Sequence, residues 1–411
     1  CHSRGKSCAY FRKEIIFNLG KSMLNTAFEP WPSFTQQEAD AVSRVLLSNK
    51  VNYWTGQECR EFEKEFAAFA QTQYAVALAN GTVALDVALK ALEIGRGDDV
   101  IVTSRTFLAS ASSIVTAGAN PIFADVELDS QNISRRTIEA VITPNTKAII
   151  CVHLAGWMCD MDPIMQLAEE KGLFVIEDCA QAHGASYKGK AAGSIGHIGA
   201  WSFCQDKIMT TGGEGGMVTT NDENLWKKMW SYKDHGKNFD SIYNKQHPPG
   251  FRWLHDSFGT NWRMMEMQAV IGRIQLQKMP EWTAKRNANM QKIHAAFQDS
   301  PYFTVNQPSP DYGHAAYKCY VQVNTDQLPT DWSRDRIMAE INALNVPCFS
   351  GSCSEVYLEH AFDNTPWRPE VRLENAKMLG ENSLMFLVHP TLSDDSIDKT
   401  VAAIQDVIAR I

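Results

Sequence analysis

The sequence contains no apolar run of roughly 18 residues, the length that a membrane-spanning helix requires, and no excess of basic residues. A net charge of −8 argues against the basic surface that binds nucleic acid or anionic membranes. The ten cysteines form no CxxC pair, so we expect reduced thiols in a cytoplasmic protein. Cys151 and His153 resemble half of a metal site, but no second pair follows at suitable spacing, and we predict no metal.

The first 22 residues are basic and differ in composition from the rest of the chain. They lack the apolar core and the small-residue cleavage site of a signal peptide. We expect residues 1–22 to be a disordered or cloning-derived leader, with Met23 as the natural start. The remaining length suits a large α/β domain over residues 23–297 and a smaller C-terminal α+β domain over residues 298–411.

Apolar strands alternate with amphipathic helices over the first half of the chain. This order predicts an α/β fold in which helices sandwich a mostly parallel sheet. Ligands of such sheets bind beyond the carboxyl ends of the strands. The strand candidates are residues 74–78, 98–104, 120–126, 147–156 and 173–178. Helical periodicity predicts a helix over residues 35–48 with Thr35 as its N-cap, and two successive helices over residues 264–277 and 281–298.

The stretch AWSFCQDKIMTTGGEGGMV, residues 200–218, places Lys207 in a glycine-rich turn between two strand-like segments. Burial in such a turn favours the neutral amine, which is a nucleophile. The best use of this amine is a Schiff base with a carbonyl, the bond that holds pyridoxal phosphate (PLP) in its enzymes. The alternative is a surface lysine on a glycine-rich hairpin.

Other positions match what PLP needs. Gly81-Thr82 begins a predicted helix, whose N-terminus suits a phosphate, although many helices begin this way. Asp178 ends a buried strand, where its carboxylate needs a cation such as a protonated pyridine nitrogen, or else caps the next turn. Phe107 could stack on the ring or belong to the core. Ser202 is either a phosphate donor or an ordinary strand serine.

Five motifs occur in the order and at the spacing of one known family: NGTVALDVALKAL, SRTFLASASS, IEDCAQAHGA, SFCQDKIMTTGGEGGMVTT and FGTNWRMMEMQAVIGRIQL. From about residue 28 to its end, the chain resembles the sugar aminotransferases of the DegT/DnrJ/EryC1/StrS family. These are fold-type I PLP enzymes. The resemblance implies a PLP enzyme that cycles through pyridoxamine phosphate (PMP), with L-glutamate as amino donor and a keto sugar as acceptor.

The resemblance also assigns roles to residues. Lys207 would form the Schiff base, and Asp178 would pair with the pyridine nitrogen. Asn261 matches an asparagine that reaches the phosphate of the neighbouring subunit's cofactor, which implies a homodimer with shared active sites. The remaining matches are to the ring hydroxyl, the ring face and the phosphate: Gln181, Phe107, Gly81, Thr82 and Ser202.

The same resemblance bears on the reaction. Dehydratases of the family replace the lysine with histidine, so Lys207 favours transamination over dehydration. A non-catalytic PLP-binding protein would usually have lost Lys207, Asp178 or Gln181, and all three are present.

The acceptor is less closely defined. Residues 346–362, VPCFSGSCSEVYLEHAF, stand where many relatives have a His-Pro loop near the sugar. This departure argues against the usual nucleotide-linked sugar. Together with residues 51–66 and 153–162, the segment makes the chain resemble the enzymes of the family that form 8-amino-3,8-dideoxy-D-manno-octulosonate (Kdo8N) for lipopolysaccharide biosynthesis, which implies 8-oxo-Kdo as the acceptor. The alternative is a nucleotide-linked 4-keto-6-deoxyhexose. Both acceptors are anionic, and the candidates for contacting them are Arg252, Arg263 and His314.

Overall fold

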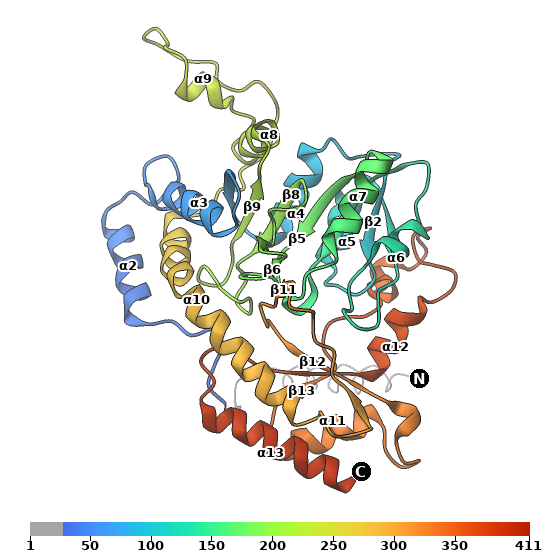
Figure 1. Cartoon of the computed structure of the whole chain (residues 1–411). Helices are drawn as coiled ribbons and strands as arrows, with labels where there is room; N and C mark the ends of the chain where they lie inside the picture. The colour runs from blue at the N-terminus through green and yellow to red at the C-terminus, as the bar shows by residue number, and fades with distance from the viewer. Residues whose placement is uncertain (1–27) are drawn as a thin grey trace, which may run out of the picture.

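A computed structural model describes residues 28–411, so the expected leader over residues 1–22 lies outside the described residues. A seven-stranded sheet in the order β1-β9-β8-β5-β4-β2-β3 organises the first two thirds of the chain (Figure 1). Only β9 runs antiparallel to its neighbours, and the other adjacent pairs are parallel, as predicted. The strands are β1 (Tyr74–Leu78), β2 (Asp99–Thr103), β3 (Asn120–Ala124), β4 (Thr146–Val152), β5 (Phe174–Asp178), β8 (Ile198–Ser202) and β9 (Gly216–Thr220).

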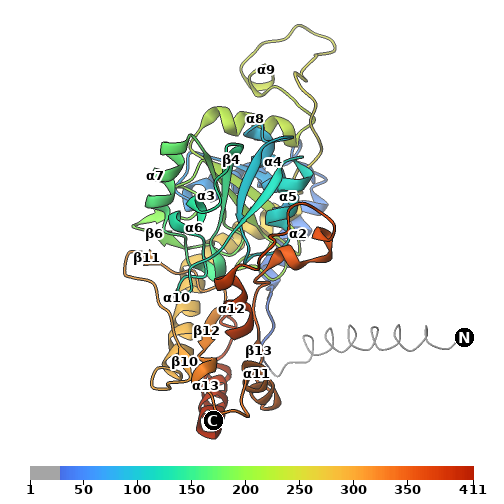
Figure 2. The same cartoon turned by 90° about the vertical axis from the view of Figure 1, so that its right-hand side faces the viewer.

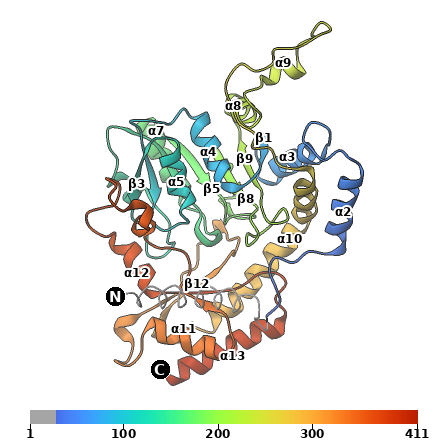
Figure 3. The ribbon, with the colours of Figure 1, turned by 180° about the vertical axis from the view of Figure 1, so that it is seen from behind.

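Helices cover both faces of this sheet because its strands are apolar on both sides. On β4, Ala148 and Ile150 belong to one buried cluster, whereas Ile149 and Cys151 belong to another. This is the period-two alternation of a strand. The first cluster contains side chains of α4 (Gly81–Ala91), α5 (Ala109–Thr116) and α8 (Glu223–Lys233). Figure 3 shows the ribbons of these three helices from behind. The second contains those of α3 (Glu58–Phe69), α6 (Arg135–Glu139), α7 (Met161–Lys171) and α10 (Glu266–Ala295).

A second sheet, antiparallel throughout and in the order β10-β12-β14-β13, lies below the first in Figure 1. A third hydrophobic cluster lies between this sheet and its helices, and Phe28 near the start of the described chain joins it. The elements are β10 (Phe303–Thr304), β12 (Cys319–Val323), β13 (Cys348–Phe349), β14 (Ser383–Phe386), α11 (Arg334–Ala343), α12 (Glu374–Asn382) and α13 (Asp394–Arg410).

Smaller elements complete the fold. A three-stranded sheet joins β11 (Tyr312–Gly313), from the C-terminal part of the chain, to β6 (Ser186–Tyr187) and β7 (Lys190–Ala191). The short helix α9 (Phe239–Tyr243) belongs to an arm that projects from the body in Figures 1 and 2. Among residues 28–411, no helix combines the length and the apolar character needed to cross a membrane.

Helix α2 (Gln36–Leu47) begins after Thr35, as predicted, and a capping box with Glu38 fixes its start. The two helices predicted over residues 264–277 and 281–298 are wrong: α10 is one helix of 30 residues with Pro280 inside it. An interior proline costs a helix about 3 kcal/mol. Packing of buried residues on both sides of Pro280, among them Met279, Arg286 and Asn289, offsets this cost.

The contact between α10 and α3 predicts that replacing the helical Gly272 by alanine destabilises the protein, although alanine normally stabilises a helix. A Cβ atom there would lie 2.5 Å from Cζ of Phe62, which is fully buried. Gly272→Ala should therefore lower the free energy of unfolding by about 1–2 kcal/mol, because overpacking at so short a contact costs about 2–3 kcal/mol and helix propensity returns about 1 kcal/mol. Urea denaturation would measure the change. Gln291→Ala, an exposed site on α10, is the control, and an unchanged or higher stability of Gly272→Ala would contradict the close contact.

Candidate active site

Lys207 lies in the turn that joins the antiparallel strands β8 and β9, as the glycine-rich stretch predicted. Its side chain is 18% exposed, and its Nζ lies 3.6 Å from Oδ1 of Asp206. Trp31 donates its indole N–H to the main-chain oxygen of Lys207 at 2.8 Å. Tyr317 donates its hydroxyl to Oδ2 of Asp206 at 2.6 Å. Segments far apart in the sequence therefore hold both the backbone and the neighbouring carboxylate of this lysine.

Asp178 ends β5 and is buried, with only two hydrogen bonds to its carboxylate. Ser110 donates its hydroxyl to Oδ2 at 2.7 Å, and Ala180 donates its N–H to Oδ1 at 3.1 Å. Burial raises the pKa of Asp178, against smaller lowering effects from these hydrogen bonds and from the charge of Lys207. No residue between 28 and 411 forms an ion pair with it. A protonated pyridine nitrogen would supply the missing cation.

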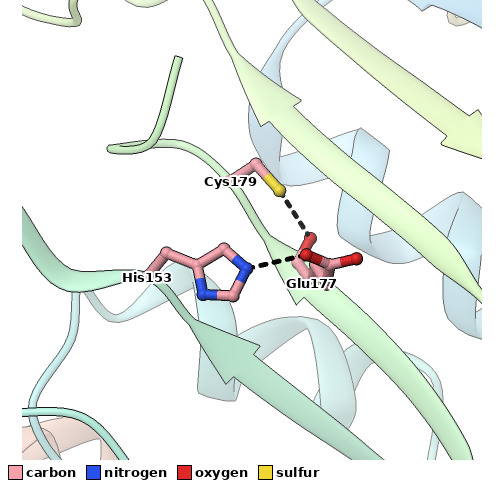
Figure 4. Close-up of side chains that lie close together, drawn as sticks. All are labelled: His153, Glu177 and Cys179. Carbon is pink, nitrogen blue, oxygen red and sulfur yellow. Dashed lines mark hydrogen bonds and ion pairs between the residues drawn. The ribbon is translucent and has the colours of Figure 1, made fainter. Parts of the chain in front are cut away.

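Glu177, the preceding residue, points to the other face of the sheet and is fully satisfied. Its carboxylate accepts hydrogen bonds from the backbone of Gly193, Ile195 and Gly196 at 3.0, 2.8 and 2.6 Å. It also pairs with Nε2 of His153 at 2.8 Å (Figure 4). Burial by itself raises the pKa of Glu177, but the bonds from His153 and the backbone outweigh it and lower the pKa overall.

Figure 4 also shows Cys179, and one ligand atom from each of His153, Glu177 and Cys179 lies within 4.8 Å of the others. Nδ1 of His153 accepts the N–H of Cys159 at 3.1 Å, so both ring nitrogens already have partners. The Cys179 thiol lies 3.5 Å from the backbone oxygen of Glu177. This cluster therefore acts as a hydrogen-bond network that fixes the turn over residues 193–196.

Gly81 and Ser202 meet at the N-terminus of α4. A Cβ atom on Gly81 would lie 2.5 Å from Cβ of Ser202, so any side chain there would fill the space. Asn80 caps the helix by accepting the N–H of Val83 at 3.0 Å. Within the described chain the amides of Gly81 and Thr82 donate to no protein acceptor. The Ser202 hydroxyl accepts from the N–H of Cys204 at 3.3 Å, which leaves its own proton for an anion. Free amides at a helix N-terminus beside a free hydroxyl are a donor set that suits a phosphate.

The two predicted ring contacts, Phe107 and Gln181, follow the ends of β2 and β5, the two strands that flank β4. Phe107 follows β2, and its side chain is 71% exposed, so its ring is free to cover a ligand. The Thr106 and Ser110 hydroxyls lie 2.8 Å apart, and Ser110 in turn donates to Asp178. This chain of hydroxyls links the Phe107 segment to Asp178. Gln181 is buried and accepts the N–H of Ala155 at 2.8 Å through Oε1.

The other predicted residues do not join this group within one chain. Asn261 is exposed in a backbone bridge with Asp234. Arg263 pairs with the buried Asp234 at 2.7 Å, and Arg252 is exposed on the projecting arm. His314 accepts the N–H of Ala316 through Nδ1, and burial lowers its pKa to about 3, so it is neutral at pH 7.

Several residues of the site went unnoticed in the sequence. The sequence could have indicated Asp206, because a carboxylate directly before Lys207 lies near its amine. It could not indicate the contacts of Ser110, Trp31 and Tyr317, since these residues reach the site only through long-range contacts.

An amine in a fixed turn, a buried carboxylate without a cation, and a helix N-terminus with a free hydroxyl fit PLP. Fold and site together define a PLP-dependent enzyme of fold type I. Residues 32–405 match the model of the DegT/DnrJ/EryC1/StrS aminotransferase family, and the chain belongs to this family. The predicted family, fold class and aminotransferase activity are thereby confirmed. So is the predicted cofactor, because amino-group transfer by such enzymes depends on PLP.

Individual relatives are similar to this chain over nearly its whole length. GDP-perosamine synthase of Caulobacter vibrioides is 36% identical over 385 residues, which cover 92% of this chain and 97% of the relative. The solved aminotransferase from Psychrobacter cryohalolentis is 67% identical, with a TM-score of 0.93 and coverage of 93% and 99%. A putative sugar aminotransferase from Streptococcus pneumoniae, solved in its PMP form, is 26% identical, with a TM-score of 0.84 and coverage of 94% and 100%.

The charge state of Asp178 predicts a pH-dependent trade-off between stability and function. Because the folded-state pKa of Asp178 is raised, its contribution favours folding at low pH and is lost as the pH rises through that pKa. PLP-free Asp178→Asn should therefore be at least as stable as PLP-free wild type at pH 8, with an advantage that shrinks toward pH 4. Melting temperatures across this range would test the expectation, with the exposed Asp398→Asn as control. A PLP-free Asp178→Asn that melts below wild type at pH 8 would show that the carboxylate is already stabilised without a ligand.

Proposed function

We propose that this aminotransferase moves the amino group of L-glutamate to a keto or aldehyde sugar used in surface polysaccharides. The observation that carries the proposal is that Lys207 acts by its charge on the buried carboxylate of Asp178, which forms no ion pair with any residue between 28 and 411. Named relatives support the sugar class: one is a GDP-perosamine synthase and another is the spore coat polysaccharide biosynthesis protein SpsC of Bacillus subtilis.

The residues of the site divide the work. Lys207 would hold PLP covalently and, once released, carry a proton to and from the reacting carbon as a general base and acid. Asp178 would keep the pyridine nitrogen protonated, and Gln181 would hold the ring hydroxyl. Gly81, Thr82 and Ser202 would bind the phosphate, and Phe107 would cover the ring. When bound, PLP supplies the electron sink that makes the substrate carbon acidic.

For the acceptor we propose 8-oxo-Kdo, which would yield Kdo8N for lipopolysaccharide. The supporting feature is the segment over residues 346–362. Val356 donates its N–H to the oxygen of Ser104 at 2.9 Å, three residues before Phe107. Ser352 lies 3.1 Å from the hydroxyl of Tyr320. This unusual segment therefore lies beside the residue that would cover the cofactor, where an acceptor sugar has to approach.

A nucleotide-linked 4-keto-6-deoxyhexose is the second candidate acceptor. GDP-perosamine synthases from Caulobacter vibrioides and Escherichia coli O157:H7, 36% and 42% identical over the matched regions, favour it.

We also propose a cytoplasmic homodimer with shared active sites. The projecting arm exposes Phe251, Trp253 and Phe258 to 80%, 85% and 99%, an apolar surface that suits a partner subunit. Asn261, at the base of this arm, has an exposed side chain available to the partner's cofactor phosphate. The eight described cysteines are free thiols, which supports a reducing compartment.

The central test follows the two halves of the reaction. L-Glutamate should bleach the PLP absorbance of the wild type. The resulting PMP form should then aminate 8-oxo-Kdo at least tenfold faster than GDP-4-keto-6-deoxymannose, as measured by mass spectrometry. Lys207→Ala should bind PLP without a borohydride-reducible bond and should show no turnover. Faster amination of the nucleotide-linked sugar would transfer the assignment to the second candidate, and turnover by Lys207→Ala would refute the role of Lys207.

The shared site predicts complementation between subunits. Asn261→Ala should weaken PLP retention by about ten- to a hundredfold, the worth of a charge-assisted hydrogen bond. In a heterodimer with Lys207→Ala, the site that keeps Lys207 receives an intact Asn261 from its partner and should regain wild-type PLP affinity. Activity of verified heterodimers at limiting PLP provides the measurement. Heterodimers without recovery would show that Asn261 acts within its own chain.

A further inference from the structure

A cavity of about 30 Å³ lies where loops of the large sheet meet the second sheet. Its wall includes residues 129–131 and 154–157 on one side, and residues of α10 and β12 on the other. The cavity adjoins the active site, because Ala155 in its wall donates to Gln181. One water needs roughly 10–15 Å³. The space therefore suits a group the size of a carboxylate, and a nucleoside diphosphate is too large for it.

Lys318 supplies the positive charge in this wall. Its Nζ lies 4.8 Å from the ring centroid of Tyr317, and Nζ of Lys207 lies 5.4 Å from the same centroid. The two amines are thus neighbours of one ring. Within residues 28–411 Lys318 forms no ion pair, and burial lowers its pKa to about 8, with the charge of Asp206 acting in the opposite direction. A partly buried amine without a counterion is stabilised by an anionic ligand.

The rest of the wall combines apolar residues, among them Leu154, Trp157 and Met290, with polar groups that are mostly neutral. His294 donates from Nε2 to the oxygen of Tyr320 at 3.2 Å, which leaves its buried Nδ1 as a free acceptor for a hydroxyl. Gln131 accepts from Arg105 at 2.9 Å through Oε1, so its amide protons remain available. Asp129, the one carboxylate of the wall, is exposed and accepts the N–H of Ser130 at 2.6 Å.

We propose that this cavity binds a carboxylate of a substrate and that Lys318 is the residue that holds it. The inference rests on the proposed function and deepens it, because L-glutamate and 8-oxo-Kdo each carry a carboxylate. The reacting end of the bound substrate would face Lys207 while its carboxylate reaches Lys318, since both amines lie within 5.4 Å of the Tyr317 ring centroid. A nucleotide-linked hexose, which carries phosphates instead, would leave the cavity without its anion.

Direct binding to the PLP-loaded enzyme tests the site without turnover. Two unreactive probes, glutarate for the donor and Kdo for the acceptor, are titrated by calorimetry against wild type, Lys318→Met and Lys318→Arg. Lys318→Met should raise the Kd of at least one probe by about ten- to a hundredfold, the loss of a charge-assisted hydrogen bond, and Lys318→Arg should recover most of it. Lys147→Met, an exposed lysine near the start of β4, is the control and should change neither Kd.

The probes also identify the source of the carboxylate. A loss confined to glutarate assigns the cavity to the donor, and a loss confined to Kdo assigns it to the acceptor. Kd values of Lys318→Met within twofold of wild type for both probes would overturn the inference, provided its melting temperature shows a folded protein. We expect that temperature not to fall, because the substitution removes a partly buried amine.

The two proposals can fail separately. Lys318-dependent binding in an enzyme that does not react with L-glutamate would keep the cavity and refute the function. Normal transamination by Lys318→Met, with unchanged Kd values for both probes, would keep the proposed function and refute the carboxylate site.

Discussion

The site depends on how one strand places two adjacent carboxylates. On β5, Glu177 and Asp178 point to opposite faces of the sheet, and both are buried. Glu177 receives three backbone N–H groups and the ring of His153, so the protein alone satisfies it. Asp178 receives two hydrogen bonds and, from residues 28–411, no cationic partner. The carboxylate of Glu177 is thus satisfied by the protein itself, whereas the carboxylate of Asp178 still needs a bound cation.

The position of Lys207 depends on contacts with residues that are far from it in the sequence. Trp31 holds the oxygen of Lys207 from 176 residues away, and Tyr317 holds Asp206 from 111 residues away. Both contacts come from outside the large sheet. The geometry of the turn between β8 and β9 therefore depends on the N-terminal segment and on the segment that leads into β12.

Local rules account for what the sequence predicted well. A continuous apolar run that stops at Ala79-Asn80-Gly81-Thr82 located β1 at its observed bounds. Thr35 marked the start of α2, and the glycines placed Lys207 in a turn between strands. Motif spacing identified the family. The residues that contact Lys207 and Asp178 could not be predicted, because no local sequence pattern indicates a long-range contact such as that of Tyr317 with Asp206. The predicted break between residues 277 and 281 was wrong because packing along both halves of α10 overrides the preference of Pro280 to end a helix.

The unbroken length of α10 has a consequence for how substrates are chosen. On one side the helix binds the large layer through ion pairs of Arg273 with Glu58 and of Lys278 with Glu38, both at 2.6 Å. Farther along, Lys285 pairs with Asp394 of α13 at 2.8 Å. A single helix that is bonded to elements of both regions couples their positions. A ligand that moved one sheet relative to the other would have to bend α10 or break ion pairs of this kind, so we expect substrates to be selected mainly by how well they fit the site as it stands.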